Sequence, residues 1–231
     1  MRIKRLLALV IPLVCAALFL RLGMWQLDRH REVAGENAGL AERLLLPAVE
    51  LSTVEGGPDE VRWTRVQTGG RFRYDLEQVH ASRPSQGSPG VHLLTPLELP
   101  GTDTLLLVVR GWVYSADASS AEQARWREAD SVTLRGYLLP LPDSGPPPPA
   151  DRPTLIRALN RRAMEARTGR PFARVQLVMT SDSAARADSV PRRLPPPTVD
   201  AGPHRSYAAQ WFAFAIIAVV GGVLLFRRTP G

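Results

Sequence analysis

Residues 203–228 read PHRSYAAQWFAFAIIAVVGGVLLFRR, a polar lead-in, an apolar run and two arginines. The segment from about Tyr207 to Phe226 has roughly the 20 apolar residues that a helix needs to cross a bilayer. Arg227 and Arg228 follow at once, as charges do where a helix leaves the membrane. We therefore predict a transmembrane helix over 204–226. Small residues four apart, Ala209 with Ala213 and Ala218 with Gly222, would let a second helix approach closely.

A second apolar run lies near the start of the chain, from Leu6 to Leu20, with three basic residues before it. The run is short for a membrane helix, but Arg21 can extend its charge to the interface and Trp25 suits the headgroup region. These residues predict a first transmembrane helix over 5–25.

A cleaved signal peptide has the same basic start and short apolar stretch. The chain stays apolar after the small residues Ala16 and Ala17, where cleavage would leave a polar mature start, so we favour a retained helix. Basic residues flank the far end of each run, and the positive-inside rule then places both termini in the cytoplasm. The prediction is a multi-pass protein of the bacterial inner (cell) membrane, with residues 30–203 as an extracytoplasmic domain.

Short apolar runs recur between the two predicted helices. RWTRVQTGGRFR (62–73) alternates around a Gly-Gly pair, which predicts strand with a bulge or tight turn. Similar runs lie at 91–97, 104–113, 132–139 and 172–179, whereas helical spacing is confined to 120–127 and 154–167. The predicted fold class is a membrane α-helical hairpin flanking an α+β domain, mainly antiparallel sheet or partial barrel. Two proline-rich stretches, 139–153 and 191–203, read as extended surface spacers.

Composition excludes several classes of function. The formal net charge is +7, but its arginines are spread along the chain without a basic stripe, so nucleic-acid binding is not expected. Four scattered histidines and one cysteine within an apolar run leave no spacing for a free metal site. Motifs for nucleophilic catalysis, phosphate loops and dinucleotide binding are absent from the sequence, so we do not expect an enzyme. A membrane-anchored hydrolase would need a nucleophile with an adjacent base.

The lead-in to the last helix carries the most informative pattern. His204, Tyr207 and Trp211 lie at i, i+3 and i+7, on one helix face. On the first helix, Arg21, Trp25 and Arg29 lie at i, i+4 and i+8, near the same membrane boundary. Two interpretations fit. One is a site for a flat ligand with acidic groups, with histidine on iron, aromatic walls and arginines on propionates; the other is an ordinary interfacial belt that anchors two helices.

Four motifs resemble those of the Surfeit locus protein 1 family, the cytochrome c oxidase assembly factors of bacteria and mitochondria. They are RLGMWQLDRH (21–30), GVHLLTPLEL (90–99), LLLVVRGWV (105–113) and HRSYAAQWFAFA (204–215). The residues that carry the resemblance are Gly23, Trp25, Gln26, Arg29, Pro96, Leu97, Arg110, Gly111 and Trp112. The family usually continues to a proline after Arg-Gly-Trp-Val, whereas this chain has YSADASS. For Arg110, Gly111 and Trp112 a purely structural role, as a strand end with a turn glycine and a packed tryptophan, is the stronger interpretation.

The resemblance implies a non-catalytic role in oxidase assembly. It implies that haem a is held for insertion into oxidase subunit I, with His204 as the candidate ligand of the haem iron. Tyr207, Trp25 and Trp211 would form walls, and Arg21 or Arg29 would meet the propionates. The implied partners are oxidase subunit I, other assembly factors and membrane lipid. The alternative is a scaffold that stabilises an assembly intermediate without binding haem. His92 would be a second ligand only if the fold carried it to the membrane surface.

Overall fold

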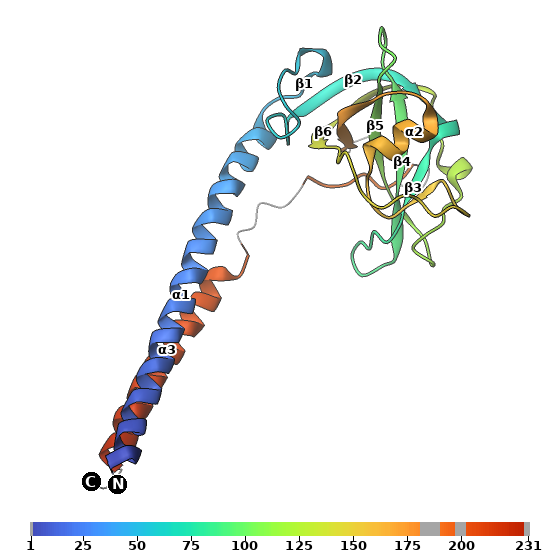
Figure 1. Cartoon of the computed structure of the whole chain (residues 1–231). Coiled ribbons are helices and arrows are strands. Elements are labelled where there is room, and N and C mark those ends of the chain that lie inside the picture. The colour runs from blue at the N-terminus through green and yellow to red at the C-terminus, as the bar shows by residue number, and fades with distance from the viewer. Residues whose placement is uncertain (1, 181–189, 197–201, 229–231) are drawn as a thin grey trace. The chain divides into compact units, whose positions relative to one another are not determined.

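The computed structural model describes residues 2–180, 190–196 and 202–228 (Figure 1). It divides into two compact units. Residues 1–42 and 198–231 form the helix unit, and residues 43–197 form the barrel unit.

Two long helices make up the helix unit. Helix α1 runs from Arg2 to Leu45 and helix α3 from His204 to Arg228, and they lie antiparallel, with the two chain ends at the same end of the pair (Figure 1). Both are long and apolar enough to cross a membrane. Helix α1 continues well past Trp25, and this continuation is rich in charged residues from Asp28 onward.

Small residues spaced seven apart form the seam between α1 and α3. The seam residues are Ala16 and Gly23 on α1, and Ala208, Ala215 and Gly222 on α3, all of them buried. A Cβ at Gly23 would stand 2.5 Å from the ring of Phe212, so only glycine allows this approach. The expected four-residue pattern at Ala209 and Ala213 is wrong, because both face outward. A seven-residue period keeps one face of each helix on its partner over several turns.

The barrel unit is a closed ring of five strands. They are β2 (Arg65–Phe72), β4 (Gly90–Glu98), β5 (Leu105–Tyr114), β6 (Ser131–Pro140) and β8 (Phe172–Met179). Around the ring the order is β2, β6, β8, β5, β4, and β4 then pairs with β2 again. Four of these pairings are antiparallel, and β5 with β8 is parallel. An odd number of strands cannot alternate in direction around a closed ring, so one parallel pair is required.

Shorter strands, one helix and 3-10 turns are added to the five-stranded ring. Strand β1 (Val49–Glu50) extends β2, while β3 (Gln78–His80) pairs with β4, and β7 (Leu155–Ile156) pairs with β3. Helix α2 (Arg161–Thr168) begins with Asn160, whose side chain accepts a hydrogen bond from the Ala163 amide, and ends at Gly169 in the left-handed conformation. Short 3-10 turns are η1 (Leu51–Thr53), η2 (Tyr74–Leu76) and η3 (Gln123–Trp126).

Leucine and valine from the five strands fill the barrel and its flanks. Val66, Leu97, Leu106, Val108 and Leu177 are fully buried in one cluster. On the other side of β5, Leu105, Leu107 and Val109 pack against α2 and β7 through Met164 and Ile156. Strand β5 is buried on both faces, which explains its apolar run from Leu105 to Val109.

The predicted fold class is confirmed, since two long apolar helices flank a mainly antiparallel barrel, and all five predicted strands are present. The bulge or turn expected at Gly69-Gly70 is wrong, because β2 runs straight through both residues in register with β6. A Cβ at Gly70 would stand 2.5 Å from the Glu98 carbonyl, so glycine is needed where β2 meets β4 and the barrel closes.

Two further expectations are corrected in part. The helix expected over 154–167 begins only at Arg161, because Leu155 and Ile156 leave the helical pattern to add strand β7 to the sheet. The helix expected over 120–127 is the single turn η3. The stretch after Pro140 has no regular structure up to β7, as its prolines predict.

Candidate functional site

The start of α3 is shaped by residues just before it. Gly202 has a φ of +71°, which turns the chain into the helix. The Pro203 carbonyl accepts hydrogen bonds from the Tyr207 amide at 3.1 Å and from the Ser206 hydroxyl at 2.8 Å. Proline is favoured at this position because its fixed φ suits the first turn and it has no amide to leave unpaired. His204 is therefore held in the first turn of α3.

His204 is hydrogen-bonded to the other long helix. Its Nδ1 atom lies 2.8 Å from Oε1 of Gln26 on α1. An amide oxygen only accepts, so in a neutral imidazole this contact places the proton on Nδ1 and the lone pair on Nε2. The ring is half-buried. Metal-binding histidines are commonly held in this way, with one ring nitrogen donating to an oxygen and the other left for the metal.

Two turns further along α3, three aromatic rings form a cluster between the helices. Trp211 stacks on Phe19 of α1 with centroids 5.7 Å apart and planes 26° apart. Phe214 lies 5.9 Å from both Phe19 and Trp211. Trp211 therefore contacts aromatic rings of both helices.

The remaining predicted site residues are more open. Trp25 is 57% exposed and Tyr207 is 46% exposed. Among the described residues, no ring contact joins Trp25 to Tyr207 or Trp211. Arg21 is exposed, and Arg29 forms an ion pair with Glu32, one turn away, at 2.7 Å. The structure brings His204 to Gln26 and Trp211 to Phe19, and leaves these four side chains on the surface of the helix pair.

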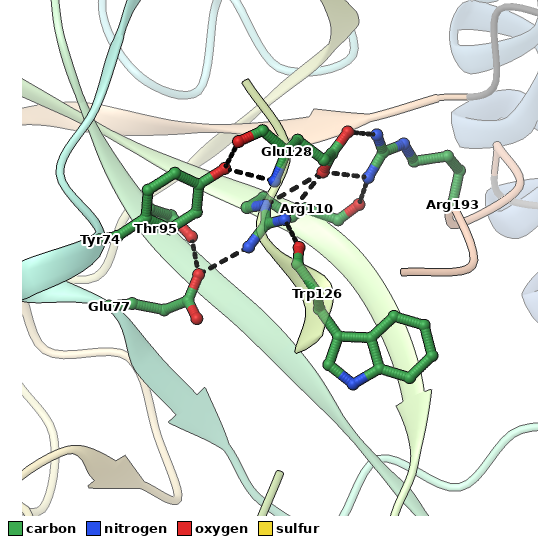
Figure 2. Close-up of polar contacts among 7 residues, drawn as sticks. All are labelled: Tyr74, Glu77, Thr95, Arg110, Trp126, Glu128 and Arg193. Carbon is green, nitrogen blue, oxygen red and sulfur yellow. Dashed lines mark hydrogen bonds and ion pairs between the residues drawn. The ribbon is translucent and has the colours of Figure 1, made fainter. Parts of the chain in front are cut away.

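The barrel unit holds a second group of polar residues, centred on Arg110 of β5. Its side chain is fully buried, and its guanidinium bonds Glu77 Oε2 at 2.7 Å, Glu128 Oε1 at 2.9 Å and the Trp126 carbonyl (Figure 2). Its carbon also lies 5.0 Å from the centroid of the Tyr74 ring. The N–H groups of the guanidinium therefore donate hydrogen bonds to two carboxylates and one backbone carbonyl.

The two carboxylates in this cluster are themselves bonded. Glu77 accepts a hydrogen bond from the Thr95 hydroxyl, and Glu128 accepts one from the guanidinium of Arg193 (Figure 2). The guanidinium of Arg193 also donates a hydrogen bond to the Arg110 carbonyl at 2.7 Å. The Tyr74 hydroxyl donates to the Glu128 carbonyl at 3.2 Å and accepts from its amide at 2.9 Å. We call these seven residues the Arg110 cluster: Tyr74, Glu77, Thr95, Arg110, Trp126, Glu128 and Arg193.

Burial acts differently on the two carboxylates. Burial raises the pKa of Glu77, and the attraction of Arg110 does not fully offset it. Burial also acts to raise the pKa of Glu128, but Arg193 and Arg110 together outweigh it and lower that pKa. Glu77 is the more deeply buried of the two and, among the described residues, forms an ion pair with Arg110 alone, whereas Glu128 forms ion pairs with Arg110 and Arg193, which accounts for the difference.

The Arg-Gly-Trp motif ties a late segment of the chain to the barrel. Gly111 has a φ of +149°, and a Cβ there would stand 2.5 Å from the Arg192 carbonyl. The Trp112 amide donates to that carbonyl at 2.8 Å, while the guanidinium of Arg192 covers the Trp112 ring at 4.2 Å. The indole nitrogen of Trp112 donates to the Arg83 carbonyl at 2.6 Å. Part of the stretch read as a free spacer is therefore docked on β5.

The Pro-Leu motif lies in β4. Leu97 is fully buried and faces Gly70 where the barrel closes. The Pro96 carbonyl accepts from the Arg73 amide at 2.8 Å. These contacts give both residues a packing role within the barrel.

His92 lies in the barrel unit opposite His80, with ring centroids 6.2 Å apart. Burial, together with the charge of Arg83, lowers the pKa of each imidazole to about 4. His80 is bonded to the Arg83 guanidinium. Within the described residues, no group of three or more histidine, cysteine or acidic side chains is arranged to hold a metal ion.

Sequence reasoning did not find Tyr74, Glu77, Glu128 or Arg193. One signal was present: Arg110 is a charge inside an apolar strand, and a buried charge needs a partner. That signal predicts that carboxylates exist nearby but cannot select them among the 22 acidic residues.

Comparison with known proteins gives a consistent picture. The model of the SURF1 family matches residues 13–216. An uncharacterised SURF1-like protein of Mycobacterium bovis is 27% identical over 225 residues, covering 93% of this chain and 80% of the relative. A SURF1-like protein of Rickettsia conorii is 24% identical over 221 residues, covering 91% and 88% of the two chains.

The matched residues take in most of α1, about half of α3 and the whole barrel. The chain therefore belongs to the SURF1 family, which is associated with oxidase assembly.

Proposed function

We propose that this protein is a non-catalytic assembly factor of the bacterial inner membrane that holds haem a for insertion into subunit I of cytochrome c oxidase. The observation that carries the proposal is the hydrogen bond from His204 Nδ1 to Gln26. It fixes the ring tautomer so that Nε2 is the nitrogen with a lone pair, as an axial ligand requires.

The residues near His204 fit a haem. Trp211 with Phe19 offers aromatic surface two turns along, and Tyr207 lies on the same side of α3. Arg21, Trp25 and Arg29 lie exposed on α1 and are the candidate partners for propionates and the ring edge. Arg29 would exchange Glu32 for a propionate, an exchange of two exposed ion pairs that costs little. Bound haem would supply the redox-active iron that the oxidase needs, and this chain's part is to hold and orient it.

The proposed topology follows from charge. Basic residues stand in the sequence at the end of the helix pair where both termini lie, so that end is cytoplasmic and the barrel unit is extracytoplasmic. In spheroplasts, a membrane-impermeant maleimide should label Ser119→Cys and leave Thr229→Cys unlabelled until the membrane is opened. The reverse labelling would contradict this topology.

The experiment that tests haem holding is an absorption spectrum of the detergent-purified protein, co-expressed with haem a synthesis. We expect a Soret band for wild type that is lost in His204→Ala and kept in His30→Ala, a matched histidine on the charged part of α1. A wild type without a Soret band would overturn the proposal.

The second candidate is a scaffold that stabilises an assembly intermediate without haem. It is favoured by the exposure of Trp25 and Tyr207, which suits anchoring or a partner helix as well as a ligand. Co-purification of oxidase subunit I with both wild type and His204→Ala, neither carrying haem, would support it.

A further inference from the structure

An apolar groove runs along one side of the helix pair, below His204. Its volume is about 590 Å³. Pro12, Cys15 and Phe19 line it from α1, and Trp211, Ala218 and Gly221 line it from α3, with further aliphatic side chains. From Trp211 to Leu225 the groove follows α3 for roughly 20 Å at 1.5 Å per residue.

The groove is open because the glycine and alanine residues that line it on α3 leave space that larger side chains would occupy. A Cβ at Gly221 would meet nothing within 4 Å, so this glycine is not required by packing between the helices. This differs from Gly23, where a Cβ would stand 2.5 Å from Phe212. Ala218, one turn before Gly222, adds little volume of its own. The groove is therefore a space that larger residues would fill without disturbing the seam.

The groove begins at Trp211 and Phe19, two helical turns from His204 and Gln26. On α3, His204, Trp211, Ala218 and Leu225 are spaced seven apart, so they follow one stripe along the helix. On α1, Pro12, Phe19 and Gln26 have the same spacing. The hydrogen bond between His204 and Gln26 joins the upper ends of these two stripes. The lower members of both stripes line the groove.

We propose that this groove binds the long isoprenoid tail of a haem whose ring is held at His204. The inference rests on the proposed function and adds to it the basis for choosing a tailed haem over haem b, which has no such chain. The ring of the ligand would lie at His204, and the apolar chain would extend along Trp211, Ala218 and Gly221.

Tethering explains why the tail would be preferred to lipid. In a bilayer an acyl chain competes for the groove on nearly equal terms, since apolar contacts gain little over lipid. A tail attached to a ring at His204 is different, because its effective concentration at the groove reaches the millimolar range or higher. The preference therefore depends on the link between the ring site and the groove.

The test compares the Kd of haem a with that of haem b, titrated into the detergent-purified full chain and followed by the Soret band. We expect wild type to bind haem a at least about tenfold more tightly than haem b. Gly221→Leu and Ala218→Leu fill the groove and should each reduce that ratio toward one by weakening haem a. Ala213→Leu, the same change on the outward face of α3, should keep the wild-type ratio.

The outcomes separate this inference from the proposed function. If wild type binds both haems equally through His204, the groove holds a lipid chain or a partner helix and the inference is overturned, while haem holding stands. If wild type binds neither haem, the proposed function itself falls. Haem b binding shows whether each variant is folded. If Gly221→Leu and Ala218→Leu still bind haem b and keep the wild-type ratio of the two Kd values, the inference is also overturned.

Discussion

The Nδ1–H group of His204 donates to Oε1 of Gln26 at 2.8 Å, and so joins two residues 178 positions apart across the helix pair. Gln26 belongs to the first-helix motif and His204 to the last-helix motif. The hydrogen bond between them gives a physical reason for the presence of both residues in those motifs. It also makes the orientation of the imidazole dependent on the packing of α1 against α3.

Replacing Gln26 tests that dependence. Gln26→Leu removes the acceptor, leaving the His204 ring free to rotate and to change tautomer, and we expect haem affinity to fall by about 10- to 100-fold. Gln26→Glu keeps an acceptor and should retain affinity near that of wild type. The Kd from a Soret titration is the measurement, with Gln210→Leu on the outward face of α3 as control. Equal Kd values for Gln26→Leu and wild type would show that the bond does not orient a ligand.

Gly23 tests the seam between the helices. Gly23→Val places a side chain where Phe212 already stands, so we expect the free energy of unfolding to fall by about 1–3 kcal/mol. Gly35→Val is the matched control on the same helix, because a Cβ there meets nothing within 4 Å. Unfolding in a titration with sodium dodecyl sulfate, followed by circular dichroism, compares the two. A Gly23→Val protein as stable as the control would mean that the helices separate without cost.

The Arg110 cluster should be sensitive to loss of its central charge. Arg110→Met removes the ion-pair partner of the buried Glu77 and one of the two arginines that pair with Glu128, and breaking a buried ion pair in this way costs about 3–5 kcal/mol. Arg110→Lys should also destabilise, because one ammonium cannot reach both carboxylates and the Trp126 carbonyl. Urea unfolding followed by tryptophan fluorescence gives the free energies.

The control for Arg110 is Arg152→Met. Arg152 is half-exposed and pairs with Asp151 at 3.9 Å, so its loss should change stability by less than about 0.5 kcal/mol. Similar effects of Arg110→Met and Arg152→Met would mean that the buried cluster contributes no more than a surface pair.

The buried His80 and the half-buried His92 predict a loss of stability in mild acid. Their pKa values fall from 6.5 to about 4 on folding, so between those values the unfolded chain binds more protons than the folded one. The contribution of these histidines to the free energy of unfolding is therefore fully present above pH 6.5. It decreases as the pH falls toward 4, by up to about 3 kcal/mol for each histidine. The midpoint of thermal unfolding, Tm, should drop between pH 7 and pH 4.5.

His92→Leu isolates this effect. Its Tm should fall less steeply with pH than that of wild type, because one of the two titrating groups is gone. The raised pKa of Glu77 acts in the opposite direction, but it is common to both proteins and cancels in the comparison. Identical slopes would contradict a buried neutral His92.

Much of the fold was predictable because it depends on local patterns. The five barrel strands are apolar runs bounded by polar turns, and each pattern of that kind is contained in about ten residues. Leu155 and Ile156 were placed wrongly because their apolar spacing suits a helix and a strand equally, and only pairing with β3 decides between them. Gly69 and Gly70 predicted a bulge or tight turn, but glycine is needed there because β4 passes close to Gly70. Strand β4 begins further along the chain, at Gly90, so the local pattern does not reveal this contact.

Two long apolar helices with basic residues at their outer ends, five strands between them and the family's motifs were predictable, because hydropathy and short-range spacing act along the chain. The folded structure was needed to show that β5 and β8 run parallel to close the ring, that Arg110 lies between Glu77 and Glu128, and that Gln26 contacts His204. These are relationships between residues far apart in the chain. Each is set by which surfaces pack together, and a pattern within one segment carries no record of that choice.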